Sequence, residues 1–136
     1  MSNAAKPKKA IDPKLAKAIK GTQSVLGKII KKPPLADKYL AKPPFTFLRD
    51  IIFSVIKNTE FATKLYTPQE MDKKSSKDKK MKIQFLNKII RLVAYCLPKR
   101  QIHIMAQKIA AGMEPIETNI FLQMLAKVSI NKDKIP

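Results

Sequence analysis

The chain has 136 residues, 45% of them apolar, and its 28 lysines and arginines against 10 acidic residues give a net charge of +18. This length predicts one domain plus a tail, and no apolar run approaches the ~18 residues that a membrane span needs. The excess of positive charge indicates an acidic partner, such as a nucleic acid, an anionic membrane or an acidic protein surface. The single cysteine, Cys96, excludes an internal disulfide and is typical of a reducing compartment.

The folded domain is expected to span residues 22–132, between a basic arm of residues 1–21 and a polar tail of residues 133–136. The arm is rich in lysine and poor in large apolar residues, which is typical of a flexible segment. A short helix is the alternative for part of it, with Asp12 and Pro13 as a start signal.

Three helices are predicted next, over 22–32, 35–41 and 45–58, from apolar residues at three- and four-residue spacing. Two Lys-Pro-Pro steps, at 32–34 and 42–44, are expected to end the first two of them. Proline has no amide donor, and it keeps the residue before it out of helical geometry. The chain therefore turns sharply twice and carries lysines at both turns.

The second half of the chain is also helical by pattern. The capping box Thr-Pro-Gln-Glu at 67–70 predicts a short helix, and a long helix follows over 79–97. Helices over 101–111 and from Pro115 to the polar tail complete the chain, and Gly112 ends the first of these. No β alternation occurs, so the fold class is all-α, a single globule of about six helices. Four methionines are expected to fill gaps in its core: Met81, Met105, Met113 and Met124.

No arrangement of residues in the sequence is typical of catalysis. The one histidine, His103, has no cysteine or carboxylate partners at the spacing of a zinc site. The three glycines are scattered, so they form no phosphate-binding loop, and no serine lies in a nucleophile elbow. We therefore predict a binding module and not an enzyme, without a metal, a cofactor or a small-molecule substrate.

Several segments resemble the intraflagellar transport protein 54 family, whose members are also called microtubule-interacting proteins linked to TRAF-type adaptors. The resemblance begins at 22–35, which holds the first Lys-Pro-Pro step, and continues through 40–52, which holds the second. It extends over 65–71 and 83–88 and ends in Ala-Ala-Gly-Met-Glu-Pro-Ile-Glu-Thr-Asn at 110–119. The spaced Lys-Pro-Pro pair together with the Glu-Pro-x-x-Thr-Asn segment makes the resemblance specific.

The resemblance implies a divergent calponin-homology domain that binds tubulin, as the dimer or in the microtubule. It implies a subunit of the intraflagellar transport B complex that serves cilium assembly. The expected location is the cilium or flagellum, the basal body and the cytoplasmic cytoskeleton. Members of the family continue into a coiled coil that pairs with other B-complex subunits, so this chain is expected to be an N-terminal fragment.

The predicted tubulin-binding site is a lysine-rich surface, because tubulin is strongly acidic and lysines on a rigid helical surface attract it. Any single lysine on a helix is usually just part of a solvated face. We therefore predict the whole group of lysines as the binding site, and not each lysine by itself. Its first part is Lys28, Lys31, Lys32, Lys38 and Lys42, and its flank is Lys82, Lys88, Lys99 and Arg100. Where the family tends to have a basic residue and a histidine, this chain has Thr46 and Arg49, which shifts the positive charge by about one helical turn.

Three other functions are compatible with the charge. The arm, with its lysines between Lys6 and Lys20, is typical of an anchor to an anionic membrane. The domain can also be a protein scaffold within the ciliary transport complex, in which the charge is incidental. Nucleic-acid binding is disfavoured, because no recognition-helix motif occurs and the aromatic residues lie on core stripes and not among the basic residues.

Overall fold

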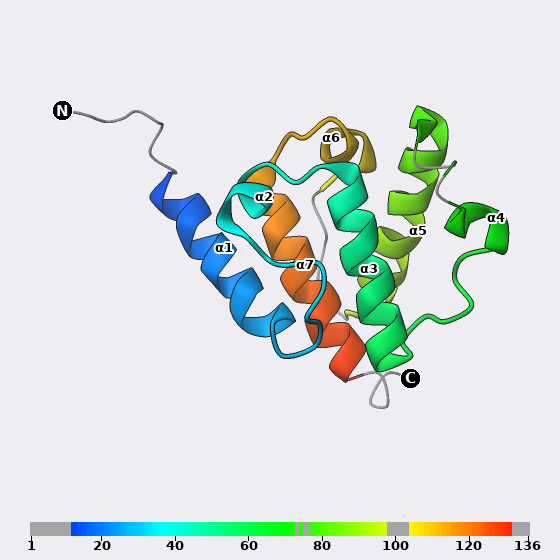
Figure 1. Cartoon of the computed structure of the whole chain (residues 1–136), viewed down its shortest axis with the longest axis horizontal. Coiled ribbons are helices and arrows are strands. Elements are labelled where there is room, and N and C mark those ends of the chain that lie inside the picture. The colour runs from blue at the N-terminus through cyan, green and yellow to red at the C-terminus, as the bar shows by residue number, and fades with distance from the viewer. Residues whose placement is uncertain (1–11, 73, 75–76, 98–103, 132–136) are drawn as a thin grey trace.

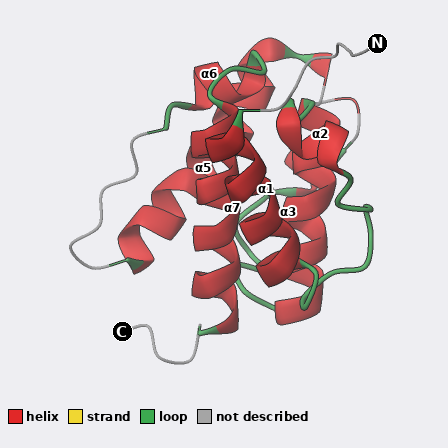
Figure 2. Ribbon diagram, turned by 90° about the vertical axis from the view of Figure 1, so that its left-hand side faces the viewer, coloured by secondary structure: helices red, strands yellow, loops and turns green. Residues whose placement is uncertain are grey.

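Seven helices form the regular structure of the part of the chain that the computed structural model describes, which is residues 12–72, 74, 77–97 and 104–131 (Figures 1 and 2). They are α1 (Pro13–Leu26), α2 (Asp37–Ala41), α3 (Phe45–Thr59), α4 (Pro68–Met71), α5 (Lys79–Cys96), α6 (Ala106–Ala110) and α7 (Pro115–Ile130). No strand occurs in these ranges, so the predicted all-α class is confirmed. None of these helices is long and apolar enough to cross a membrane.

Helix α7 lies at the centre of the fold, between α1 and α3 in Figure 1, and it contacts α1, α2, α3 and α5. It buries residues around much of its circumference, as a helix surrounded by others must. Helices α3 and α5 instead bury one stripe each against this centre. The fully buried side chains of the core include Leu26, Leu40, Leu48, Ile51, Ile52, Leu86, Ile89, Leu122 and Leu125.

The first helix differs from its prediction at both ends. It begins at Pro13, where the Asp12 carboxylate accepts a hydrogen bond from the Lys14 amide at 2.8 Å, so the Asp-Pro start signal is confirmed. It runs without a break through Thr22, the residue at which we expected the domain to begin. Residues 13–21 are therefore the larger part of a helix that packs along α7.

The end of this helix was predicted at Lys32 and lies at Leu26, so that part of the prediction is wrong. At Gly27 the backbone comes so close to the preceding turn that a Cβ atom would lie 2.5 Å from the Gln23 carbonyl oxygen. Two side chains of α3 then hold the next stretch as a turn: Asn58 donates to the Ile29 carbonyl at 2.8 Å and Ser54 to the Lys32 carbonyl at 2.7 Å. These tertiary hydrogen bonds satisfy the carbonyls of Ile29 and Lys32 beyond the end of the helix.

Helix α6 is also shorter than predicted. Of the expected range 101–111, residues 101–103 lie outside the described residues, and Ile104 and Met105 are not helical. Met105 is the residue before the helix and is 53% exposed, so its predicted place in the core is wrong. The predicted end is confirmed, because Gly112 follows the helix with a φ of +78°, in the left-handed region that favours glycine.

The other predicted boundaries agree closely with the structure. The capping box of α4 is present, with the Thr67 hydroxyl accepting from the Glu70 amide at 3.1 Å and the Glu70 carboxylate from the Thr67 amide at 2.9 Å. Asp78 caps α5 by accepting from the amides of Lys80 and Met81.

Replacement of Asp12 by alanine is expected to lower the free energy of unfolding by about 1 kcal/mol, because the Lys14 amide loses its acceptor at the start of α1. Asp12→Asn keeps an acceptor oxygen and serves as the control, with a loss below about 0.5 kcal/mol. Urea unfolding of the three proteins measures the difference. Equal stability of the alanine variant and the parent would contradict the assignment of residues 13–21 to the cooperative fold.

Candidate functional site

The lysines of the first Lys-Pro-Pro step are presented from a fixed backbone. Lys28, Lys31 and Lys32 are all exposed in the connection between α1 and α2. This connection is attached to α3 through the hydrogen bonds from Ser54 and Asn58. Exposed Lys57, which the sequence analysis did not include, lies on α3 beside these two anchors. We call Lys28, Lys31, Lys32 and Lys57 the first basic surface.

The lysines around the second Lys-Pro-Pro step lie at the other end of α3. Lys38 and Lys42 are exposed on and just after α2, and α3 begins at Phe45. Lys82 reaches this end from α5, with its Nζ 5.7 Å from the centroid of the Phe45 ring. We call Lys38, Lys42 and Lys82 the second basic surface.

The structure therefore divides the predicted group of lysines into two. The first basic surface is attached to α3 at Ser54 and Asn58, and the second surrounds the start of this helix at Phe45. These positions are nine to thirteen residues apart, which is about 14 to 20 Å along a helix. A partner that contacts both surfaces must extend over this distance.

Helix α2 is held in place by two amide side chains. Gln23 of α1 donates to the Leu35 carbonyl and to the Asp37 carboxylate, both at 2.7 Å. Asn119 of α7, which is fully buried, donates to the Leu40 carbonyl at 2.9 Å. The Lys42 side chain lies against the turn between α6 and α7, with its Cε 3.6 Å from where a Cβ of Gly112 would be. The second basic surface thus stands on a rigid base.

Asn119 also joins α1 to α7, a role that the sequence analysis missed. Its Oδ1 accepts a hydrogen bond from the Thr22 hydroxyl at 2.8 Å, and its Nδ2 donates to the Pro115 carbonyl at 2.9 Å. The preceding Thr118 donates to the Glu114 carbonyl at 2.9 Å. The Glu-Pro-x-x-Thr-Asn segment was the signal in the sequence that could have indicated this role, because Thr118 and Asn119 are its last two residues. Both have a structural role here.

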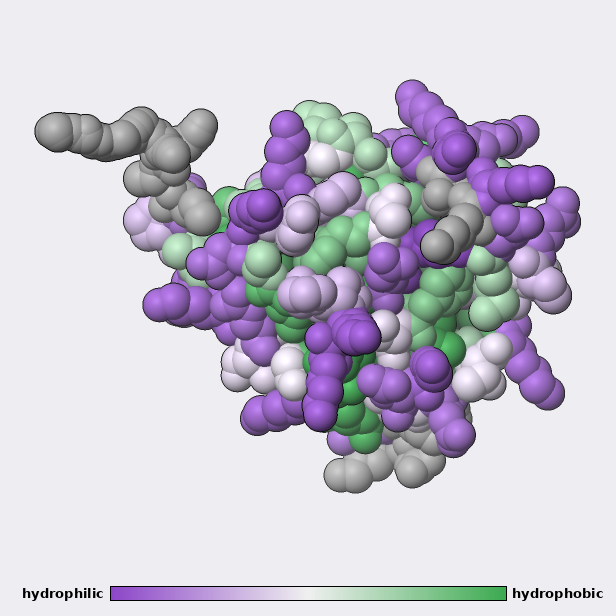
Figure 3. Space-filling model, in the orientation of Figure 1, coloured by the Kyte–Doolittle hydropathy of each residue, from purple (hydrophilic) through white to green (hydrophobic). Residues whose placement is uncertain are grey.

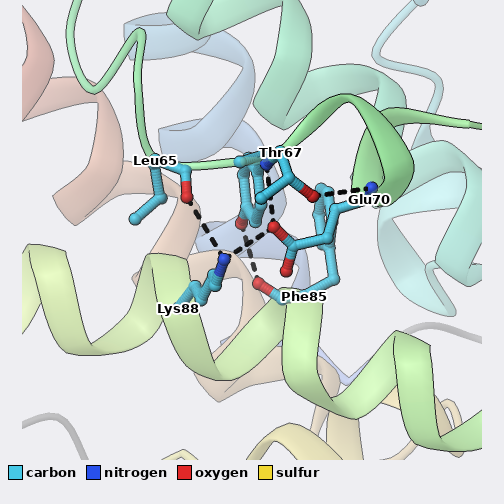
Figure 4. A network of polar contacts seen from close by, with 6 residues as sticks. Leu65, Thr67, Glu70, Phe85 and Lys88 are labelled. Atoms are coloured by element: carbon cyan, nitrogen blue, oxygen red, sulfur yellow. Dashed lines mark hydrogen bonds and ion pairs between the residues drawn. The ribbon is translucent and has the colours of Figure 1, made fainter.

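Lys88, predicted on the flank of the site, is paired within the chain. Its Nζ lies 2.6 Å from Oε1 of Glu70 and 3.3 Å from the Leu65 carbonyl, so it joins α5 to the segment that enters α4 (Figure 4). Burial opposes the ionisation of Glu70, but hydrogen bonds from Lys88 and Thr67 outweigh it and hold the pKa of this carboxyl below its usual value. The charge of Lys88 is thus largely compensated.

An aromatic stack lies beside this ion pair. The rings of Tyr66 and Phe85 are parallel with their centroids 4.2 Å apart, and the Tyr66 hydroxyl donates to the Phe85 carbonyl at 2.7 Å. Burial, with a contribution from the Glu70 carboxylate, raises the pKa of Tyr66 far above its usual value, so the hydroxyl stays protonated. The whole arrangement fixes α4 against α5.

Arg49 lies inside the molecule and not on its surface. It is 5% exposed, its guanidinium donates to the Met71 carbonyl at the end of α4, and its Cζ lies 4.7 Å from the centroid of the Phe53 ring. Thr46, one turn earlier on α3, is exposed. Arg49 therefore adds no charge to the outer face of α3. Lys99 and Arg100, also predicted on the flank, lie outside the described residues.

A further group of lysines surrounds the start of α5, where Figure 3 shows hydrophilic side chains gathered at the upper right. Its exposed members are Lys74, Lys77, Lys79 and Lys80. Asp72 and Asp78 lie within the same stretch and offset part of this charge. In the described part of the chain, no group of three or more histidine, cysteine, aspartate or glutamate side chains is placed to hold a metal ion.

Comparison with known proteins identifies the family. Residues 18–131 match the family described as the microtubule-binding protein MIP-T3 CH-like domain. The chain belongs to this family. TRAF3-interacting protein 1 of Danio rerio is 46% identical over 113 residues, which are 83% of this chain and 18% of that protein. TRAF3-interacting protein 1 of Mus musculus is 43% identical over 117 residues, which are 86% of this chain and 19% of that protein.

Membership of the MIP-T3 CH-like family confirms three predictions from the sequence. These are the calponin-homology-like fold, the resemblance to the intraflagellar transport protein 54 family, and a microtubule-binding module that is not an enzyme. The match begins at residue 18, within α1 and before the predicted boundary at Thr22. The chain spans less than a fifth of the length of the curated relatives it matches.

Proposed function

We propose that this MIP-T3 CH-like domain binds acidic tubulin, as the dimer or in the microtubule, through its first and second basic surfaces. The observation that carries the proposal is the attachment of the connection between α1 and α2 to α3. It restrains the backbone from which Lys28, Lys31 and Lys32 extend, so less backbone freedom is lost when they bind.

The pairing of charges within the chain supports this choice of lysines. Among the described residues, Lys28, Lys31 and Lys32 take part in no ion pair, whereas Lys88 is paired with Glu70 and Lys108 with Glu114. Exposed ion pairs contribute about 0.2 to 1 kcal/mol each, so several must act together. Their sum weakens as salt screens the charges, and the affinity should fall steeply with ionic strength.

The test is binding of the whole 136-residue chain to microtubules and to tubulin dimers across a salt series. The variant Lys31→Glu/Lys32→Glu is expected to bind about tenfold or more weakly at low salt, because it replaces two attractions by two repulsions. Lys14→Glu/Lys17→Glu changes the net charge equally but on exposed positions of α1, and is expected to bind within about threefold of the parent.

Each result has a definite meaning, provided that both variants melt near the parent temperature. An equal loss in both variants would assign the effect to net charge and not to the first basic surface. Absence of parent binding at low salt would remove tubulin as a direct partner of the domain. Vesicles with and without acidic lipid would then test the anionic membrane, and the scaffold role would remain.

The wider role is the one that the resemblance to the intraflagellar transport protein 54 family implies, and it is part of the same proposal. We propose that the protein to which this domain belongs is a subunit of the intraflagellar transport B complex that acts in cilium assembly. It is expected in the cilium or flagellum, at the basal body and on the cytoskeleton. Imaging of the tagged protein in ciliated cells tests this, and its exclusion from cilia would contradict it.

A further inference from the structure

Two apolar side chains flank the second basic surface and are exposed. Tyr39 of α2 is 42% exposed, and Met113, in the turn between α6 and α7, is 55% exposed. We expected Met113 in the core, and that prediction is wrong. The two elements meet where Lys42 lies against Gly112, at the end of the molecule where Figure 1 shows α2, α6 and the start of α3.

Both side chains are presented from ordered backbone. The Tyr39 ring packs on the buried Phe47 ring with 5.4 Å between centroids, and the Lys38 Nζ lies 5.1 Å from the centre of the Tyr39 ring. The Met113 amide donates to the Lys108 carbonyl at 2.8 Å, immediately after Gly112 turns the chain. Neither apolar group is thus part of a free loop.

The charges around these side chains are mainly positive. Lys38 and Lys42 have no ion pair within the described residues, whereas the carboxylates next in sequence to Lys38 and Met113 are both engaged. Asp37 accepts a hydrogen bond from Gln23 at 2.7 Å, and Glu114 lies 3.5 Å from Lys108. Two exposed apolar side chains with lysines beside them are complementary to an acidic segment that also carries an apolar side chain.

We propose that Tyr39 and Met113, together with Lys38 and Lys42, dock an acidic segment of the microtubule partner through an aliphatic or aromatic side chain of that segment. This inference rests on the proposed function and deepens it, because it assigns a contact that is not electrostatic. Salt screens the lysine contacts but not the burial of apolar surface. The two apolar side chains therefore set the affinity that remains at high salt. The lysines set how steeply the affinity falls as the salt concentration rises.

The test compares two variants of the same composition. Tyr39→Ser/Met113→Ser removes the proposed anchor, and Tyr95→Ser/Met71→Ser removes a tyrosine and a methionine that are 80% and 48% exposed elsewhere. Microtubule co-sedimentation is measured over a salt series. The first variant is expected to bind about fivefold more weakly at every salt concentration, with the parent's salt slope. The control variant is expected to bind within about twofold of the parent.

Other outcomes overturn the inference. If the parent binds and Tyr39→Ser/Met113→Ser binds equally well, the surface is purely electrostatic and only this inference fails. If the variant has a flatter salt slope, its loss came from displaced lysines, and the inference also fails. If the parent does not bind at low salt, both this inference and the proposed function fail. Met113→Ser alone, in an exposed turn, replaces the double variant if loss of the Tyr39–Phe47 contact lowers the melting temperature.

Discussion

Replacement of Asn119 by alanine is expected to lower the free energy of unfolding by about 3 kcal/mol. The fully buried amide serves α1, α2 and α7 at once, so its loss leaves the Leu40 carbonyl without its donor and removes the Oδ1 that accepts from the Thr22 hydroxyl. Unpaired buried polar groups and the cavity that remains both destabilise the fold. For a chain of this length, the melting temperature should fall by about 10 °C.

Two further variants separate the contributions at this position. Thr22→Val removes the hydroxyl that donates to Asn119 Oδ1 while it keeps the volume, and a loss of about 1 kcal/mol is expected. Asn119→Asp keeps the acceptor but removes the donor to Leu40, and should be nearly as destabilising as alanine because it buries a carboxyl. A change below about 0.5 kcal/mol for Asn119→Ala in urea unfolding would show that the amide is not what holds these helices together.

Replacement of Lys88 by methionine is expected to cost about 2 to 3 kcal/mol of stability at neutral pH, somewhat less than a fully buried pair. The Glu70 side chain is only 12% exposed, so removal of the ammonium group takes away one of the interactions that stabilise a largely buried carboxylate. Methionine keeps most of the aliphatic stem beside Tyr66, which isolates the effect of the charge.

The dependence of this loss on pH gives a second readout. In the parent the pKa of Glu70 is lowered, so its stabilising contribution is present above the unfolded-state pKa of about 4.3 and is lost as the pH falls through the folded-state pKa. In Lys88→Met, burial without the cation should raise this pKa, so the difference from the parent should shrink as the pH is lowered toward 4.

The matched control for the ion pair is Glu70→Gln/Lys88→Met. Glutamine keeps the capping box with Thr67 and removes the buried charge, so the double variant should recover a large part of the loss seen in Lys88→Met. Urea unfolding at several pH values measures all three proteins. A double variant as unstable as Lys88→Met would contradict the ionic origin of the effect and point to lost packing.

Periodicity was sufficient for the long helices and insufficient for the connections. The apolar stripes of α3, α5 and α7 and the start signals at Asp12 and Thr67 are local, and the structure confirms them. Ile29 and Ile30 also have helical spacing, but they pack against the core from a turn that Ser54 and Asn58 of a later helix hold. A local sequence pattern cannot predict those hydrogen bonds, because their donors lie in a later helix.

In the candidate site, too, the sequence pattern did not predict which side chains lie together. Lysines close in sequence were predicted as one group, yet Lys31 and Lys42 lie toward opposite ends of α3. The pairing of Lys88 with Glu70 joins residues 18 positions apart, and the exposure of Met113 depends on how the turn after α6 meets α2. Charge and hydropathy predict that such groups exist, whereas only packing decides which of them face solvent together.

The position of the two basic surfaces along α3 has a consequence for partner choice. A helix does not stretch, so its length sets a constant interval between two weak cationic contacts. Once one contact forms, the other meets its counterpart at a high effective concentration, but only if the partner displays acidic groups at the matching interval. A regular polymer offers that interval again and again, whereas a flexible acidic chain must be ordered into it first. The domain is thus expected to recognise the spacing of acidic groups on its partner as well as their charge.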